Sequence, residues 1–185
     1  MIGIDEAGRG ALAGPVVAAC VCLHQKINNL NDSKKVPLEK RLDVFEKIKK
    51  QADFIGIGVV GPRIIDESNI LKATLKAMKI SYQGCPQSDT PIIIDGNTLP
   101  DIDNAKCIVK ADTKIPAVMA ASIVAKVYRD SIMVALSSKY RNFNFNENMG
   151  YGTSSHLQSI SNFKISDYHR VSFKPVAIKK LLNNE

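Results

Sequence analysis

The apolar residues of the first third of the chain fall into three short runs and one longer amphipathic segment. The runs cover residues 2–5, 14–23 and 53–61 and are rich in small and β-branched residues, which favours β-strands. Between the second and third runs, residues 37–51 place apolar side chains at helical spacing with charges on the other side, which predicts an amphipathic helix. Its expected inner positions are Leu38, Leu42, Phe45, Ile48 and Lys49.

The middle of the chain alternates predicted helices with two further short strands. Pro62 suits a first helical turn, and the helical pattern continues to residue 83, where "GCPQSD" ends it. Two apolar runs follow, "TPIIIDGN" and "NAKCIVKAD", and each ends at an aspartate. A long helix is expected over residues 117–140, and its alanine-rich first half suits close packing against a sheet.

The C-terminal third is more polar. Residues 141–156 are rich in asparagine and interrupted by glycine, which is typical of a mobile loop, and residues 166–185 predict a turn and a short basic helix. Early strands are close enough for antiparallel pairing, and later ones are separated by helices. We therefore expect an α/β fold, with a mixed central β-sheet flanked by α-helices and a C-terminal helical segment. No repeat or linker divides residues 1–185, so we expect one domain.

Composition adds a preference for polyanionic partners. The chain has 185 residues, a net charge of +7 and a pI near 9.2, which favours nucleic acid without requiring it. No signal peptide or apolar run of membrane-spanning length is visible, so we expect no membrane partner. The four cysteines, at positions 20, 22, 85 and 107, fit neither a disulfide framework nor a zinc site with a nearby histidine. We interpret them as reduced core thiols of a cytoplasmic protein.

Acidic residues recur at the ends of predicted strands. Asp5 and Glu6 lie in or after the first strand, Asp95 follows "PIII", and Asp112 closely follows "CIV". Strand ends in α/β sheets line the functional crevice, so these carboxylates are expected to converge. Grouped carboxylates repel one another unless a cation joins them, which predicts a site for Mg²⁺, or for Mn²⁺ in its place.

Each acid also has a simpler interpretation. Asp95 before glycine suits a turn, and Asp112 suits a cap before the long helix. Asp5 and Glu6 are harder to explain in this way, because neighbours in a strand face opposite sides and one carboxylate would face the core. Asp130 lies four residues after Lys126 and is expected to form an exposed ion pair, so it is a secondary site candidate.

Six blocks in order resemble the signature of one enzyme family and span nearly the whole chain. They are "GIDEAGRGALAGPVV", "NDSKKV", "IIIDGN", "VKADTKIPAVMAASIVAKVYRD", "GYGTSSH" and "YHRVSFKPV". In these blocks the chain is similar to the type 2 ribonucleases H, specifically bacterial ribonuclease HII. Two positions depart from the family: Ala11 stands where proline is usual, and Val36 where leucine is usual. Neither change removes a chemical group.

The resemblance implies a ribonuclease H-like fold and a metal-dependent endonuclease. The implied substrates are the RNA strand of RNA/DNA hybrids and duplex DNA with embedded ribonucleotides, cut on the 5′ side to leave 5′-phosphate and 3′-hydroxyl ends. The family's catalytic carboxylates fall on the four acids chosen above, Asp5, Glu6, Asp95 and Asp112. Its glycine-arginine-glycine motif falls on Gly8, Arg9 and Gly10, and its substrate-sensing tyrosine falls on Tyr151.

Two divalent ions about 3.5 to 4 Å apart serve such a reaction, one activating the attacking water and the other stabilising the leaving oxygen. We expect Asp5 and Asp95 to share the ions, with Glu6 and Asp112 completing one shell each. Glycines 8 and 10 let the backbone approach a ribose 2′-hydroxyl, and Arg9 braces the loop or meets a phosphate. We expect the Tyr151 ring to pack on the next deoxyribose while its hydroxyl binds the 2′-hydroxyl.

The remaining expectations are peripheral. Lys34 and Lys35 are expected to bind phosphates, and His156 and His169 to be structural or secondary groups of the site. The default oligomeric state is a monomer, and no sliding-clamp peptide is recognisable at the C-terminus. Two alternatives stay open: a non-catalytic nucleic-acid-binding module, which needs only the basic surface, and another ribonuclease H-like nuclease, such as a resolvase or exonuclease.

Overall fold

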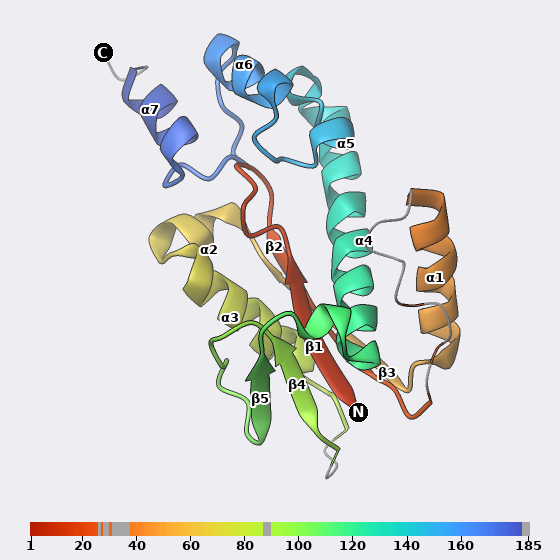
Figure 1. The fold of residues 1–185 in the computed structure, drawn as a ribbon. Helices are drawn as coiled ribbons and strands as arrows, with labels where there is room; N and C mark the ends of the chain where they lie inside the picture. The colour runs from red at the N-terminus through yellow and green to blue at the C-terminus, as the bar shows by residue number, and fades with distance from the viewer. Residues whose placement is uncertain (26, 28–29, 31–37, 87–89, 183–185) are drawn as a thin grey trace.

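The computed structural model describes residues 1–25, 27, 30, 38–86 and 90–182. Among these residues, five strands form one mixed sheet in the order β3-β2-β1-β4-β5 (Figure 1). The antiparallel half is β1 (Ile2–Ala7), β2 (Val16–Cys22) and β3 (Phe54–Val60), and the parallel half adds β4 (Ile92–Asp95) and β5 (Ala105–Ile108) beside β1. The α/β class and the mixed pairing expected from the sequence are confirmed.

Helices cover both faces of the sheet. On one face pack α2 (Pro62–Glu67) and α3 (Ile70–Tyr82), and on the other α4 (Pro116–Lys139), with α1 (Leu38–Gln51) outside it (Figure 1). Alternation along β1 directs Ile2 and Ile4 toward α3. Gly3 faces α4, where a Cβ atom would overlap the backbone of Ala117, so the glycine and the alanine-rich half of α4 permit their close contact.

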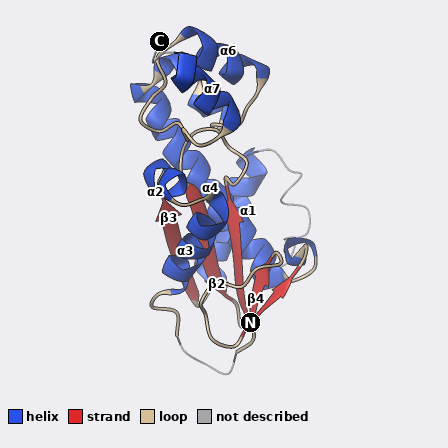
Figure 2. Ribbon diagram, turned by 90° about the vertical axis from the view of Figure 1, so that its left-hand side faces the viewer, coloured by secondary structure: helices blue, strands red, loops and turns tan. Residues whose placement is uncertain are grey.

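Short helices gather beyond one end of the sheet, on the side away from the N-terminus (Figure 2). They are η3 (Arg141–Phe143), α5 (Phe145–Asn148), α6 (Ser154–Asn162) and α7 (Lys174–Leu182). They share an apolar cluster with Leu12 and Met133. Much of the segment predicted as a mobile loop, residues 141–156, is therefore helical. Phe143 and Phe145 are buried despite their asparagine neighbours, and this burial orders the segment.

The inner face predicted for α1 is partly wrong. Ile48 is fully buried and Phe45 packs against the cluster under α4, but Leu42 is exposed. Lys49 lies at the surface, where it pairs with Glu46. The helix packs mainly against α4, and Ile48 reaches the cluster between α4 and the sheet, so a narrower apolar stripe suffices.

The cysteines are free thiols, and Cys20 and Cys22 share one face of β2, as expected. The expectation that no histidine lies near them is wrong for Cys22, because ligand atoms of Cys22, His24 and Asp53 lie within 4.8 Å of one another. The signal was available in the sequence, since His24 follows Cys22 by two residues. No helix among the described residues has the length and apolar character needed to cross a membrane.

Candidate metal and nucleic-acid site

Three predicted acids meet at one end of the sheet. Asp5 comes from β1, Asp95 is the last residue of β4, and Asp112 lies on η2 (Ala111–Thr113). One carboxylate oxygen from each lies within 4.8 Å of the others. Because β1 and β4 are parallel neighbours with Ile4 opposite Ile94, the next residue on each strand is an aspartate facing the same side.

Backbone amides hold two of these carboxylates in place. Asp95 Oδ1 accepts a hydrogen bond of 2.7 Å from the N–H of Ala111, and Asp5 Oδ1 accepts one of 2.7 Å from the N–H of Glu6. Lys110 adopts a left-handed conformation with φ of 59°, which turns the chain from β5 into η2. That turn brings Asp112 to the strand-end aspartates.

Glu6 borders the cluster but differs in its partners. Its Oε1 atom pairs with Arg9 Nη1 at 3.2 Å, while its Oε2 atom is buried with no hydrogen-bond partner among the described residues. Burial raises the pKa of Glu6, the Arg9 guanidinium opposes that rise, and Asp95 adds to it. A buried acceptor without a donor, beside three further carboxylates, is the environment that a bound cation relieves.

The donor set therefore suits a hard divalent cation. Asp5, Asp95 and Asp112 offer only carboxylate oxygens, the ligands preferred by Mg²⁺ and Mn²⁺. Repulsion among three carboxylates at this separation favours occupancy by an ion of the opposite charge.

The glycine-arginine-glycine loop follows the acids directly, and its two glycines differ. Gly8 is buried at φ of 94°, and a Cβ atom there would overlap the guanidinium of Arg129. Gly10 is exposed, lies outside the left-handed region, and a Cβ atom would find nothing within 4 Å. The fold thus explains Gly8, whereas Gly10 meets no internal constraint.

Two buried arginines that the sequence interpretation did not single out hold this loop. Arg170 donates to the carbonyl oxygens of Gly14, Arg9 and Gly8 at 3.0, 2.9 and 2.7 Å. Arg129 donates to those of Pro15, Met149 and Ala13 at 3.0, 2.9 and 3.1 Å. Burial lowers the pKa of both guanidiniums, and the carbonyl dipoles offset part of the cost of burying their charge.

Tyr151 also lies against Arg129. The Arg129 guanidinium carbon lies 5.1 Å from the centre of the Tyr151 ring, and Lys126 Nζ lies 5.6 Å from it. Gly8 and Tyr151 therefore both contact Arg129, which brings the predicted sugar-sensing groups to one side chain.

His156 and His169 form a buried, hydrogen-bonded pair that contacts the backbone of Tyr151. His156 Nδ1 donates to the Tyr151 carbonyl oxygen at 2.9 Å, so its Nε2 must accept from His169 Nε2 at 3.1 Å. His169 Nδ1 is then the acceptor for the Ser166 N–H at 3.0 Å. Burial lowers the pKa of both rings, that of His169 to about 4, so both are neutral at pH 7. In this arrangement the two rings secure the Tyr151 turn.

The other predicted residues lie apart from this arrangement. Asp130 pairs with Lys126 at 2.7 Å as expected, but the pair is not exposed on the aspartate side: Asp130 is only 6% exposed and also lies 3.5 Å from Arg41. It thus links α1 to α4, and the expectation of a surface pair is wrong. Lys34 and Lys35 lie outside the described residues.

Comparisons with known proteins agree with the motifs. Residues 2–176 match the family described as Ribonuclease HII. The chain is 45% identical to the Ribonuclease HII of Francisella tularensis subsp. tularensis strain WY96-3418 over 186 aligned residues, 99% of this chain and 98% of the relative. It is 44% identical to that of Francisella tularensis subsp. novicida strain U112, covering 96% and 98% of the two chains.

Solved structures share the fold. The RNase HII of Archaeoglobus fulgidus, determined in complex with PCNA, is 26% identical, with a TM-score of 0.79 over 97% of this chain and 96% of that one. The ribonuclease H2 of Pyrococcus horikoshii OT3 has a TM-score of 0.83 at 23% identity, over 100% and 98%. Bst-RNase HIII, determined with Mn²⁺, has a TM-score of 0.72 at 17% identity, over 98% and 69%.

The loop contacts predict the effect of Arg170→Lys. A lysine ammonium cannot span the three carbonyls that the guanidinium fork reaches, so buried acceptors lose their donors. The free energy of unfolding, measured in urea, is expected to fall by about 2 to 4 kcal/mol. The control Arg63→Lys, at a side chain that is 90% exposed, is expected to change it by less than about 0.5 kcal/mol. Equal stability of the two variants would contradict the proposed bracing.

Proposed function

The chain belongs to the ribonuclease HII family, and on that premise we propose that its clustered carboxylates are the catalytic groups. It is a metal-dependent ribonuclease H, an endonuclease that hydrolyses RNA paired with or joined to DNA. Cleavage on the 5′ side of the ribonucleotide, with 5′-phosphate and 3′-hydroxyl products, is consistent with the family. This activity excludes a purely non-catalytic binding module as its whole function.

The observation that carries the residue assignment is the convergence of Asp5, Asp95 and Asp112 beside the buried Oε2 atom of Glu6. We assign all four as metal-holding residues. Bound divalent ions supply an activated water and stabilise the leaving 3′ oxygen. The oxygen-only donor set favours Mg²⁺, with Mn²⁺ as a substitute. The backbone amides of Glu6 and Ala111 orient two of the carboxylates in advance, so little reorganisation is required when substrate binds.

Recognition of ribose is assigned to the loop of Gly8, Arg9 and Gly10. Arg170 holds the carbonyls of Gly8 and Arg9, so the loop backbone is rigid where it follows the acids. Gly10 is the exposed position at which the main chain can approach a 2′-hydroxyl without an intervening side chain. Arg9 neutralises part of the charge on Glu6 and is exposed for contact with a phosphate.

Tyr151 is assigned to the neighbouring sugar. Its ring lies against Arg129 and Lys126, and its carbonyl oxygen accepts a hydrogen bond from His156. The residue therefore has little freedom to move away from a bound sugar. A ring in this position packs on a deoxyribose, whereas a 2′-hydroxyl on that next sugar would collide with it. The arrangement favours cleavage at a junction from RNA to DNA, a preference that a resolvase or exonuclease has no need for.

The basic charge and the free thiols bear on phosphate binding and on the cellular compartment. We propose that residues 1–185 form one catalytic domain that acts as a monomer, with Lys34 and Lys35 adding phosphate contacts. Four free cysteines suit the reducing cytoplasm.

Asp95→Asn tests the metal assignment. The asparagine oxygen still accepts from Ala111, so the fold is retained, but the charge that holds the cation is lost. On a duplex with one embedded ribonucleotide, cleavage in Mg²⁺ or Mn²⁺ is expected to fall to less than about one-hundredth of the wild-type rate. Binding of the duplex, followed by fluorescence anisotropy, is expected to persist. Asp43→Asn is the surface control, and an all-DNA duplex should stay intact. Wild-type cutting of both duplexes, or of neither, would overturn the proposed function.

Gly10→Ala tests the sugar-sensing loop. Because a methyl group finds open space there, the melting temperature is expected to match the wild type. The methyl would stand between the backbone and the ribose, so cleavage is expected to slow about tenfold or more, a cost of roughly 1.4 kcal/mol in the transition state. Gly61→Ala, a second position with open space, should change neither quantity. Full activity of Gly10→Ala would mean that this loop does not meet the sugar.

Tyr151 variants separate the ring from the hydroxyl. Tyr151→Ala is expected to abolish the preference for an RNA-to-DNA junction over a continuous hybrid. Tyr151→Phe keeps the ring, so it should retain the preference but lose up to about tenfold in rate with the hydrogen bond. Rates on the two substrates measure both effects, with Tyr128→Ala, an exposed aromatic on α4, as the control. An unchanged preference in Tyr151→Ala would assign the residue to folding alone.

A further inference from the structure

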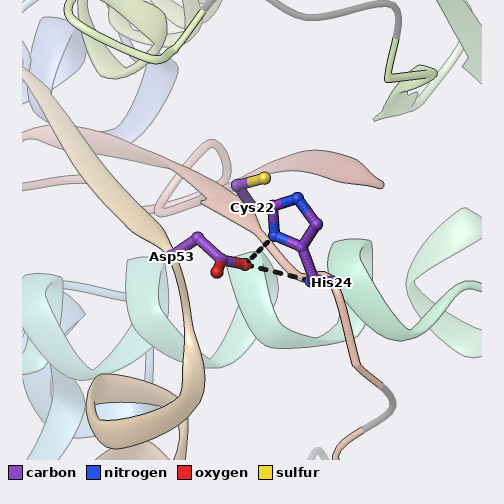
Figure 3. Close-up of side chains that lie close together, drawn as sticks. All are labelled: Cys22, His24 and Asp53. Carbon is purple, nitrogen blue, oxygen red and sulfur yellow. Dashed lines mark hydrogen bonds and ion pairs between the residues drawn. The ribbon is translucent and has the colours of Figure 1, made fainter.

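A second group of ligand-bearing side chains lies where β2 ends and β3 begins. Cys22 is the last residue of β2, His24 follows it by two positions, and Asp53 directly precedes β3. Cys22 pairs with Phe54 across the antiparallel ladder, and the Asp53 N–H donates to the Cys22 carbonyl at 3.0 Å. This pairing brings together three side chains from opposite ends of a long connection (Figure 3).

The three side chains already face one another. The sulfur of Cys22, an imidazole nitrogen of His24 and a carboxylate oxygen of Asp53 lie within 4.8 Å of one another. Asp53 Oδ2 lies 2.5 Å from His24 Nδ1 and accepts a second bond, of 3.0 Å, from the His24 N–H (Figure 3). The backbone bond fixes the carboxylate in position, so the site needs only a small separation of the ring from the oxygen to admit an ion.

The group is separate from the carboxylate cluster. Asp5 is opposite Ala19 on β2, three residues from Cys22, which corresponds to about 10 Å along the strand. Alternation also places Cys22 on the α3 face of the sheet, in the same cluster as Ile2 and Ile4, whereas Asp5 is directed to the α4 face with Gly3. The two sets of ligands therefore cannot share an ion.

The chemistry of the ligands also differs. A thiolate and an imidazole select borderline transition metals over Mg²⁺. The Cys22 side chain is buried, while the side chains of His24 and Asp53 are 70% and 42% exposed, so solvent can supply a fourth ligand. Burial raises the pKa of the Cys22 thiol, the terminal ammonium of Met1, bound to the Leu23 carbonyl at 2.7 Å, opposes that rise, and Asp53 adds to it.

We propose that Cys22, His24 and Asp53 bind a zinc-type divalent cation, with thiolate, imidazole and carboxylate as three of its four ligands and water as the fourth. On binding, the proton of the Cys22 thiol and the proton between His24 and Asp53 would pass to the solvent, and the ion would link the end of β2 to the start of β3. Its role is structural and independent of the proposed catalytic assignment.

Cobalt(II) is the probe, because thiolate coordination gives a charge-transfer absorption that oxygen ligands do not. The reduced full-length chain is titrated with Co²⁺ in excess Mg²⁺, which occupies the carboxylate cluster, and Zn²⁺ is then used to displace the cobalt. Wild type is expected to show the thiolate band together with the intense visible bands of tetrahedral Co²⁺. Cys22→Ser and His24→Asn are each expected to abolish the thiolate band or to weaken binding at least about 100-fold.

Matched controls make the outcome decisive. Cys107→Ser removes a different thiol, which is partly exposed, and Asp95→Asn removes a ligand of the other site; both should retain the full spectrum. Because the His24 side chain is largely exposed, His24→Asn tests the proposal without disturbing the core. Absence of the thiolate band in wild type, its persistence in His24→Asn with cobalt affinity unchanged, or its loss in Asp95→Asn would each overturn the proposal.

Discussion

The structure depends on two positive charges buried among main-chain oxygens. Arg129 and Arg170 approach the loop after β1 from α4 and from the C-terminal segment, and their six hydrogen bonds described above all end on backbone carbonyls. Their partners are separated from them by 20 to 162 residues. The guanidiniums therefore join distant parts of the chain, and they add to the short antiparallel bridge between Ala13 and His169 that also holds the loop.

A few residues before this loop, the chain must hold negative charges close together instead of burying positive ones. Three carboxylates within 4.8 Å of one another repel by about 1 to 4 kcal/mol per pair at such separations. Strand geometry and the amides of Glu6 and Ala111 hold them there without requiring mutual attraction. The cationic scaffold and the anionic cluster are linked through Glu6 and Arg9, whose ion pair lies at their border. The rigid loop thus also positions the Glu6 carboxylate, whose Oε2 atom has no hydrogen-bond donor among the described residues.

The local pattern of apolar and polar residues was sufficient to predict those parts of the structure that depend on residues close in sequence. Periodicity located the five strands and the long helix, and strand ends indicated the acids, because parallel neighbours deliver consecutive positions to one edge. The bracing arginines were not predictable, since their value lies in carbonyls far away along the chain. Phe143 and Phe145 were obscured for the same reason: only contact with Leu12 and Met133 turns an asparagine-rich stretch into helical turns. Asp53 became a neighbour of His24 only through the β2–β3 pairing.

Because Arg129 and Arg170 bind backbone carbonyls, substitutions of the residues that carry those carbonyls are tolerated better than substitutions of the arginines. Every residue type has the same main-chain oxygen, so the bonds to Arg9, Ala13 and Met149 survive a change of side chain at those positions. No substitution in the loop can compensate for a lost guanidinium, because there is no side chain in the interaction to co-vary with it. Pairwise covariation among homologues would therefore overlook the contact that shapes the site.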